Sequence, residues 1–516
     1  MPLDNILDTI VEKRKTDILK SGYVAGENIP DKRRRRVTPF MDRKGSILEI
    51  KRASPSKGDI ALDLDAKETA LKYAASGTAA ISVLTERHYF KGCLKDLIDV
   101  CEVIDRYSIE HSEYEMPAIL RKDFLFSVED IETSYLCGAD AVLLISRMLD
   151  KDIMTAMALK CQELKMTAFV ELRQKEDLDK LEHIICHVDR KYIVCGVNSR
   201  DLRDFSIDLL TPCCMKDKIR CIMGEDARVI FESGIKSDRS AYLAGSFGFS
   251  GMLLGEGAAR NPDSSAVFVS AFADGKENSN SIFWKWYAVK LAEKKRKTPY
   301  IKICGITNTE DALKAAFLGA DYLGFVFYDK SQRNVLPDTV RTVKNELKKL
   351  NLDKIVKTVA VVADPYSDES RCAFRLVEDK VIDLIQFHSC SDYIMSDDFS
   401  PNLPHYAAVN VKSESDLSLV DSLIDMGECR ILLDAGSHEV IGGSGCSIEK
   451  SFVLKAQKKI KVWLAGGINC DNIRDIIVNY RPELLDVSSG LEEYPGKKDF
   501  NKMKRFFDII NKLEEV

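Results

Sequence analysis

The sequence predicts an α/β protein built from two fused (β/α)8 TIM barrels that are joined by a helical linker. Short runs rich in β-branched residues alternate with helical patterns, which is typical of parallel strands with crossover helices. The alternation runs through the first half, stops at a polar stretch near residue 275, and then starts again. A chain of 516 residues has room for two barrels of about 250 residues each.

Each half contains eight expected strands in succession. In the first half they lie at 47–52, 80–86, 118–124, 141–146, 168–173, 193–201, 229–234 and 251–257. In the second half they lie at 300–305, 322–327, 357–362, 384–389, 407–412, 429–435, 461–467 and 484–490. Residues 276–298 combine a Gly/Asn/Ser-rich stretch with a helical segment, so we expect them to link a domain at 1–275 to one at 299–516.

The composition excludes several classes of protein. The formal net charge is −6, so a basic nucleic-acid surface over the whole chain is not expected. Without a run of 18 apolar residues no transmembrane helix is expected, and acidic residues interrupt the N-terminal segment where a signal peptide would be apolar. The 15 cysteines lack CxxC pairs, which favours reduced thiols. We expect a cytoplasmic monomer without nucleic-acid or membrane partners.

Glycine-rich turns recur at equivalent places in the two halves. FESGI and LAGGI follow the seventh strand of each half, and GEG and SSG follow the eighth. Barrels often bind phosphate there, on backbone N–H groups that glycine leaves open. The sequence therefore predicts a phosphorylated ligand in each half, although the glycines could also serve only to make tight turns.

Polar residues in the first half cluster where strands are expected to end. Glu49 and Lys51 alternate with apolar neighbours, so their side chains share one face of a strand. Inward-facing charge is costly unless it is paired or used, and barrel enzymes keep catalytic groups at this rim. The other members of the cluster are Lys122, Glu171, Asn198, Arg200, Glu232 and Ser233.

Five motifs of the first half, ILEIKRASPSKG, ILRKDF, FVELR, GVNSRDL and FESGI, resemble the indole-3-glycerol phosphate synthase family over about residues 1–270. The resemblance implies closure of a carboxyphenylamino-deoxyribulose 5-phosphate to an indole, with loss of CO2 and water. Lys122 would be the acid of ring closure, which burial and neighbours must tune toward the working pH. Glu171 would be the general acid/base of dehydration. Lys51 would hold the substrate carboxylate or act as a second acid, and Glu49 would orient both lysines.

The same resemblance implies contacts with the rest of the substrate. Asn198 and Ser233 would hydrogen-bond the anthranilate part or the hydroxyls. Arg200 would either position its loop or touch the substrate, and Glu232 would bind substrate. The phosphate would lie on Ser54, Gly234, Gly255 and the backbone of Glu256, whose carboxylate must then turn away.

In the second half, the motifs KICGIT, GFVFY-x-KS-x-R, IQFH, LLDA-G, GGSG, LAGGI and DVSSG-x-E-x-x-PG-x-KD resemble the phosphoribosylanthranilate isomerase family over about residues 299–516. The resemblance implies an Amadori rearrangement with Asp434 as acid and Cys304 as base. The base role requires that the Cys304 thiol lose its proton more readily than an ordinary cysteine. Arg333 would hold the anthranilate carboxylate through its planar fork. Phosphate would lie on Gly466, Gly467, Ser489 and Gly490, with Gln386 and His388 lining the pocket.

Several alternatives stay open. After GGSG the family usually continues Lys-x-Phe-Asp-Trp, whereas this chain has Cys446 to Lys450, so the synthase could be active beside an impaired second barrel. Another sugar-phosphate barrel enzyme, such as an epimerase or an aldolase, would share the fold. The basic run Lys32–Arg36 is expected to be a solvated loop, a nucleic-acid-binding segment being the weaker alternative. The resemblances imply neither a metal nor an organic cofactor.

Overall fold

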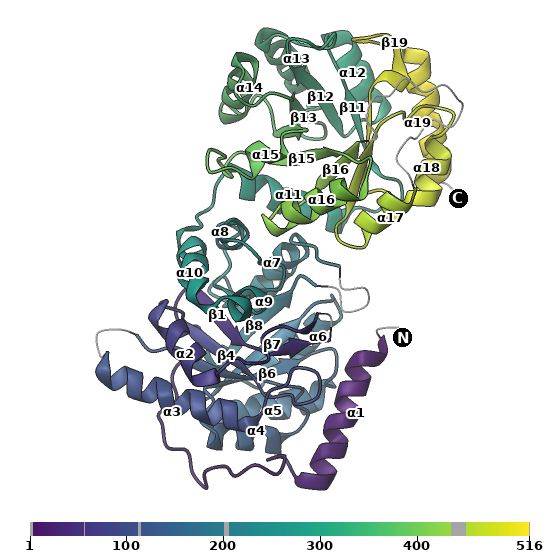
Figure 1. Ribbon diagram of the computed structural model, residues 1–516. Helices are drawn as coiled ribbons and strands as arrows, with labels where there is room; N and C mark the ends of the chain where they lie inside the picture. The colour runs from purple at the N-terminus through teal and green to yellow at the C-terminus, as the bar shows by residue number, and fades with distance from the viewer. Residues whose placement is uncertain (1–3, 56, 112–114, 201–205, 435–449, 515–516) are drawn as a thin grey trace. The chain divides into compact units, whose positions relative to one another are not determined.

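The computed structural model describes residues 4–55, 57–111, 115–200, 206–434 and 450–514. The chain forms two compact units, Met1–Glu277 and Asn278–Val516. Each unit contains a closed barrel of eight parallel strands surrounded by helices (Figure 1). The predicted fold class is therefore confirmed, and each expected strand region contains a strand of a barrel.

The first barrel is closed by its first strand, which pairs with both the second and the last. Leu48 lies opposite Leu254 on one side and opposite Ile81 on the other. The strands are β1 (Gly45–Ile50), β4 (Ala80–Leu84), β5 (Ala118–Lys122), β6 (Ala141–Ile145), β7 (Thr167–Leu172), β8 (Ile193–Asn198), β9 (Val229–Glu232) and β10 (Gly251–Leu254). A short antiparallel pair, β2 (Ala53–Ser54) and β3 (Gly58–Asp59), follows β1.

Helices connect these strands, and one helix precedes them. The connecting helices are α2 (Ala66–Ala75), α3 (Leu94–Glu110), α4 (Val128–Leu136), α5 (Lys151–Glu163), α6 (Asp177–Ile185), α7 (Thr211–Met223), α8 (Asp238–Ser246), α9 (Glu256–Arg260) and α10 (Ser265–Asp274). The preceding helix is α1 (Asp4–Ser21). Polar caps begin several of them: the Ser127 hydroxyl accepts the N–H of Asp130 at the start of α4, and this satisfies one of the otherwise unpaired donors there.

The basic run between α1 and β1 is only partly solvated. Arg33 and Arg35 both pair with the buried Asp140, at 2.7 and 2.8 Å, and their side chains are only 4% and 7% exposed. The expectation of a solvated loop is therefore wrong for these two arginines. They anchor the segment to the barrel, and alternate residues of the run, Lys32 and Arg34 among them, remain exposed.

The second barrel has the same closed order. Its strands are β11 (Tyr300–Cys304), β12 (Tyr322–Phe327), β13 (Lys357–Val362), β14 (Leu384–His388), β15 (His405–Asn410), β16 (Ile431–Asp434), β17 (Val462–Ala465) and β18 (Leu484–Val487). Its helices are α12 (Thr309–Leu318), α13 (Pro337–Lys349), α14 (Asp368–Glu378), α15 (Ser391–Ile394), α16 (Glu414–Asp425), α17 (Lys450–Gln457), α18 (Ile473–Tyr480) and α19 (Phe500–Glu514). A small hairpin, β19 (Glu492–Tyr494) and β20 (Lys497–Lys498), precedes α19.

Helix α11 (Ser279–Glu293), which lies in the segment expected to be a linker, belongs to the second unit. Its Trp284 and Tyr287 are buried against Trp463, with ring centroids 6.1 and 5.7 Å apart. The Tyr287 hydroxyl and the Trp463 indole N–H both donate to Glu483, at 2.8 and 3.0 Å. Glu483 directly precedes β18, so α11 covers the amino ends of the strands of the second barrel.

Among the helices that the structure describes, none is both long enough and apolar enough to cross a bilayer.

Candidate active sites

A cavity of about 670 Å³ opens at the carboxyl ends of the strands of the first barrel. Parallel strands of a barrel end at the same face, so side chains from distant stretches of sequence meet there. Every site residue predicted in the first half lines this cavity. They are Glu49, Lys51, Ser54, Lys122, Glu171, Asn198, Arg200, Glu232, Ser233, Gly234, Gly255 and Glu256.

Two lysines and two glutamates form a chain of contacts inside this cavity. Lys51 Nζ donates to Glu49 Oε1 at 2.8 Å. Lys122 Nζ lies 3.4 Å from Glu49 Oε2 and 3.3 Å from Glu232 Oε2. Glu49 thus lies between the two lysines and contacts both of them.

The local charges give these groups different protonation states. Burial alone would raise the pKa of Glu49, but Lys51 and Lys122 outweigh it and hold that pKa at about 2. Burial, aided by the nearby Glu171, raises the pKa of Glu232 to about 8, and burial also raises the pKa of Glu171. At neutral pH Glu49 is therefore ionised, whereas burial favours the protonated form of Glu232.

Lys122 departs from the expectation of an amine tuned toward neutrality. Burial opposes its charge, but Glu49, Glu232 and Glu171 outweigh burial and raise the pKa of Lys122 above its usual value. The Lys122 amine is therefore a stable ammonium ion.

Two glycines make room for the carboxylates. A Cβ on Gly255 would lie 2.7 Å from Glu49 Oε1, and one on Gly196 would lie 2.0 Å from Glu232 Oε1. Gly255 was expected only to approach phosphate. Gly196 was missed, although a glycine inside the β-branched run IVCGVN is itself a sign of a close approach in a strand.

Other predicted residues occupy turns around the rim. The Asn198 side chain hydrogen-bonds Glu171 and also accepts the backbone N–H of Arg200 at 3.0 Å. Ser233 and Gly234 have φ of 68° and 80°, a left-handed turn that exposes backbone at the end of β9. The carboxylate of Glu256 accepts from Arg260 Nε at 3.1 Å, so it is held along α9.

The apolar wall of the cavity was missed from the sequence. Phe90 and Phe124 lie with ring centroids 6.1 Å apart, and α1 adds Ile10 and Val11. These residues have the composition of a core, and only their position at the open end of the barrel distinguishes them from one. Together they give the charged cavity a flat apolar side.

In the second barrel, Cys304 ends β11 beside two buried charged groups that the sequence did not single out. Lys302 Nζ lies 3.5 Å from Cys304 Sγ and 2.6 Å from Asp486 Oδ2. It also donates to Gln386 Oε1, which accepts the Tyr406 hydroxyl as well. Lys302 stands two residues before Cys304 on the same strand, the spacing that made Glu49 and Lys51 noticeable.

Burial and Asp486 raise the pKa of the Cys304 thiol, although Lys302 and Lys498 act to lower it. The expectation of an easily ionised thiol is therefore wrong. Space around the sulfur is tight, because a Cβ on Gly324 of the neighbouring strand would lie 2.7 Å from Cys304 Sγ.

The other predicted residues of the second site are only partly brought together. His388 Nδ1 lies 3.9 Å from Asp434 Oδ2, at the ends of β14 and β16. Arg333, expected to hold a substrate carboxylate, instead pairs with Glu492 through Nε and Nη2, at 2.9 and 2.6 Å. The altered segment from Cys446 to Glu449 lies outside the described residues.

The two glycine turns of the second barrel lie against each other. Gly466 and Gly467, after β17, have φ of 95° and 63°. Ser489 and Gly490 lie in the turn after β18, where a Cβ on Gly490 would be 2.0 Å from the Ile468 carbonyl oxygen. Only glycine permits this approach, which places backbone from both turns side by side.

Among the residues that the structure describes, no three His, Cys, Asp or Glu side chains are arranged to hold a metal ion.

Two closed barrels, each with ionisable side chains gathered at the carboxyl ends of its strands, define a double-barrel enzyme with one site in each unit. Residues 12–270 match the family model of indole-3-glycerol phosphate synthase. The chain therefore belongs to that family, and residues 301–509 match the model of N-(5'phosphoribosyl)anthranilate isomerase.

Curated relatives span both barrels. A multifunctional tryptophan biosynthesis protein of Schizosaccharomyces pombe is 29% identical over 99% of this chain, which covers 66% of that relative. The chain thus spans less than two thirds of that protein's length. The tryptophan biosynthesis protein TrpCF of Yersinia pestis is 28% identical over 91% of this chain and 85% of its own length. The solved phosphoribosyl anthranilate isomerase of Thermotoga maritima is 32% identical, covers 42% of this chain with all of its length, and has a TM-score of 0.35.

Proposed function

We propose that the chain catalyses two consecutive reactions of tryptophan biosynthesis. The second barrel would isomerise N-(5-phosphoribosyl)anthranilate to 1-(2-carboxyphenylamino)-1-deoxyribulose 5-phosphate. The first barrel would close that product to indole-3-glycerol phosphate with loss of CO2 and water. The observation that carries the proposal is the single cavity in which Lys122 contacts Glu49 and Glu232 beside Glu171, together with the two family matches.

In the first barrel, the Lys122 ammonium polarises the ribulose carbonyl while the anthranilate ring carbon attacks it. The forming alkoxide is far more basic than an amine, so it takes the proton of Lys122 even though the neighbouring carboxylates favour the ammonium form. Lys51 holds the substrate carboxylate or serves as the second acid. Phe90 and Phe124 supply a flat wall for the anthranilate ring.

Dehydration then requires a group that both gives and takes a proton. Loss of CO2 returns its bonding electrons to the ring. Glu171 protonates the new hydroxyl, which leaves as water, and the resulting carboxylate then removes the C1′ proton so that the double bond of the indole forms. Burial raises the pKa of Glu171, which suits this exchange near neutral pH. The polar groups of the substrate are held by Asn198, Ser233 and Glu232. Arg200 positions the loop that carries it. The phosphate lies on Ser54, Gly234, Gly255 and the backbone of Glu256.

In the second barrel, Asp434 protonates the ribose ring oxygen as the C1′–O bond breaks, which leaves a Schiff base. Because the pKa of the Cys304 thiol is raised, its thiolate is the minor form, which the ammonium group of Lys302 favours. This thiolate removes the C2′ proton, and the resulting enolamine becomes the ketone. Gln386 and His388 line this site. Arg333 takes the anthranilate carboxylate in place of Glu492. The backbone at Gly466, Gly467, Ser489 and Gly490 takes the phosphate.

We also propose that the chain works as a cytoplasmic monomer without a metal, an organic cofactor or a nucleic-acid partner. The chemistry above needs only proton transfers and hydrogen bonds, so side chains of the protein suffice for it. The burial of Arg33 and Arg35 against Asp140 supports the part of this proposal that concerns nucleic acid.

The test is an assay of the purified chain with each substrate supplied separately. We expect decay of phosphoribosylanthranilate fluorescence in one assay and formation of indole-3-glycerol phosphate in the other. Ring closure without isomerisation would favour an impaired second barrel. Borohydride trapping of a substrate on Lys122 would favour an aldolase and contradict the proposed synthase chemistry.

A further inference from the structure

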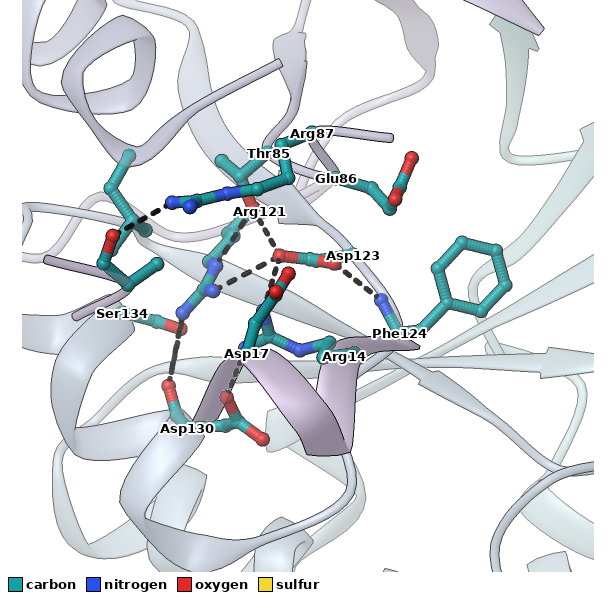
Figure 2. Close-up of polar contacts among 12 residues, drawn as sticks. Arg14, Asp17, Thr85, Glu86, Arg87, Arg121, Asp123, Phe124, Asp130 and Ser134 are labelled. Carbon is teal, nitrogen blue, oxygen red and sulfur yellow. Dashed lines mark hydrogen bonds and ion pairs between the residues drawn. The ribbon is translucent and has the colours of Figure 1, made fainter. Parts of the chain in front are cut away.

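Arg14 of α1 reaches from outside the barrel to the end of β5. Its Nη2 lies 2.5 Å from Asp130 Oδ1 and its Nη1 lies 3.4 Å from Asp123 Oδ2 (Figure 2). Both carboxylates are fully buried, and Arg14 itself is 9% exposed. Removing one partner of a buried ion pair destabilises the fold, because the remaining charge stays buried without compensation.

The two carboxylates that Arg14 contacts also hold the chain that follows Lys122. Asp123 Oδ1 accepts the backbone N–H of Phe124 at 2.8 Å, and Asp130 Oδ2 accepts the backbone N–H of Phe126 at 3.1 Å. Arg121 and Thr85 fix the other Asp123 oxygen, at 3.1 and 2.6 Å (Figure 2). Arg14 therefore joins two groups that together shape the first turn after Lys122.

Helix α1 also faces the cavity on the same side. Leu7, Ile10 and Val11 line it, as do Lys122 and Phe124. The helix thus supplies cavity wall with one set of side chains, and holds the end of β5 with Arg14.

We propose that Arg14 is a positioning residue for ring closure. By tying Asp123 and Asp130 to α1, it sets the placement of Lys122 and Phe124 against the substrate. The inference rests on the proposed synthase function of the first barrel, and it assigns to α1 a part in catalysis beyond covering the cavity.

A second tether of α1 provides the matched control. Asp17 Oδ2 lies 2.7 Å from His88 Nε2, at a partly exposed position that touches neither Asp123 nor Asp130. The charge of Asp17 also acts on Arg14, but Asp17→Asn weakens the attachment of the same helix and leaves the contacts of Arg14 with Asp123 and Asp130 in place. Comparison with Arg14→Met therefore separates docking of α1 from positioning of Lys122.

The experiment uses the full chain with Arg14→Met, Arg14→Lys or Asp17→Asn. For Arg14→Met we expect kcat of ring closure to fall about tenfold while KM changes by less than about threefold, because a misplaced acid costs transition-state stabilisation more than binding. Arg14→Lys should recover part of kcat, and Asp17→Asn should stay within about twofold of the unmodified chain. Hydrogen exchange of peptides covering 121–130 should accelerate in Arg14→Met alone. Isomerisation should remain unchanged in all three variants.

Unchanged kcat in Arg14→Met with faster exchange across α1 would overturn the proposal, because α1 would then be docked by Arg14 without positioning Lys122. Equal loss of both activities would also overturn it, since that would indicate general destabilisation. If the unmodified chain lacks ring closure, the proposed function fails. In that case exchange at 121–130 still decides the positioning role, which unaltered exchange in Arg14→Met would refute.

Discussion

At the first strand of each barrel, a lysine stands two residues from an acidic group. The pKa of that acidic group is lowered in the first barrel and raised in the second. At the end of β1, Glu49 and the first residue after the strand, Lys51, stand two residues apart and meet at 2.8 Å. In β11, Lys302 and Cys304 stand two residues apart and meet at 3.5 Å. Residues two apart on a strand share a face, so each barrel brings a lysine beside a group that must carry negative charge.

The surroundings then decide whether that group is ionised. Glu49 has a second lysine beside it, and its pKa lies at about 2 despite burial. Lys302 is shared between Cys304 and Asp486, so burial and the carboxylate keep the pKa of the thiol raised. The balance of all neighbouring charges, rather than one favourable partner, therefore sets the protonation state of a buried group.

The largest expected effect separates the two barrels. Lys122→Met should lower ring closure by about a thousandfold, within the range of about 10²- to 10⁴-fold for loss of a general acid, and leave isomerisation within about twofold. Cys304→Ala should do the reverse. The two separate substrate assays measure both effects. Equal harm to both activities by either variant, in a folded protein, would break the assignment of one reaction to each barrel.

Removal of Lys302 should sharpen the electrostatic comparison. Lys302 lowers the pKa of Cys304, so Lys302→Met should raise that pKa further and move the rising limb of isomerase kcat/KM to higher pH. At pH 7 we expect a loss of about thirtyfold with ring closure intact. Lys314→Met, at an exposed lysine of α12 that pairs with Glu310, is the control. An unmoved pH profile would show that Cys304 does not depend on this ammonium group.

Gly255 should affect ring closure only because it leaves room for the neighbouring charged side chains. Gly255→Ala puts a methyl group 2.7 Å from Glu49 Oε1, so Glu49 and Lys51 must move and ring closure should fall about tenfold. Gly257→Ala meets Leu254 at an ordinary 3.4 Å and should change the rate by less than about twofold. Steady-state kinetics of both variants test this. Similar losses in the two would mean that the turn itself, and not the space, is sensitive.

Stability, rather than the rate of either reaction, should respond to the titration of Glu232. The pKa of Glu232 is about 8 in the folded chain, whereas an unfolded Glu has one near ~4.3. The folded chain therefore holds a proton between these values that the unfolded chain releases, and its stability falls as pH rises through this window. Glu232→Gln does not titrate, so its free energy of unfolding should gain roughly 4 kcal/mol on the unmodified chain between pH 5 and pH 8, because each pH unit inside the window contributes about 1.4 kcal/mol. Urea unfolding at both pH values measures the gain, and a constant difference would argue against a protonated Glu232.

Much of the architecture and of the first site could be predicted from sequence. Alternating strands and helices fix a parallel barrel, and the ends of its strands meet at one face, so Glu49, Lys122 and Glu171 could be placed together without coordinates. Apolar wall residues such as Phe124 could not be identified, because a side chain facing a cavity and one facing the core have the same composition. Arg14 was missed because its partners lie more than one hundred residues away along the chain.

The sequence by itself determined the two barrels, the order of their strands and the residue types at the rim of each site, because these follow from local periodicity and chain direction. Only the tertiary structure decided which charges neutralise one another. It favoured the protonated form of Glu232 through burial, set Arg333 against Glu492 and divided Lys302 between two acids. Protonation depends on burial and on every charge within a few ångströms, and those neighbours come from segments that no local pattern connects.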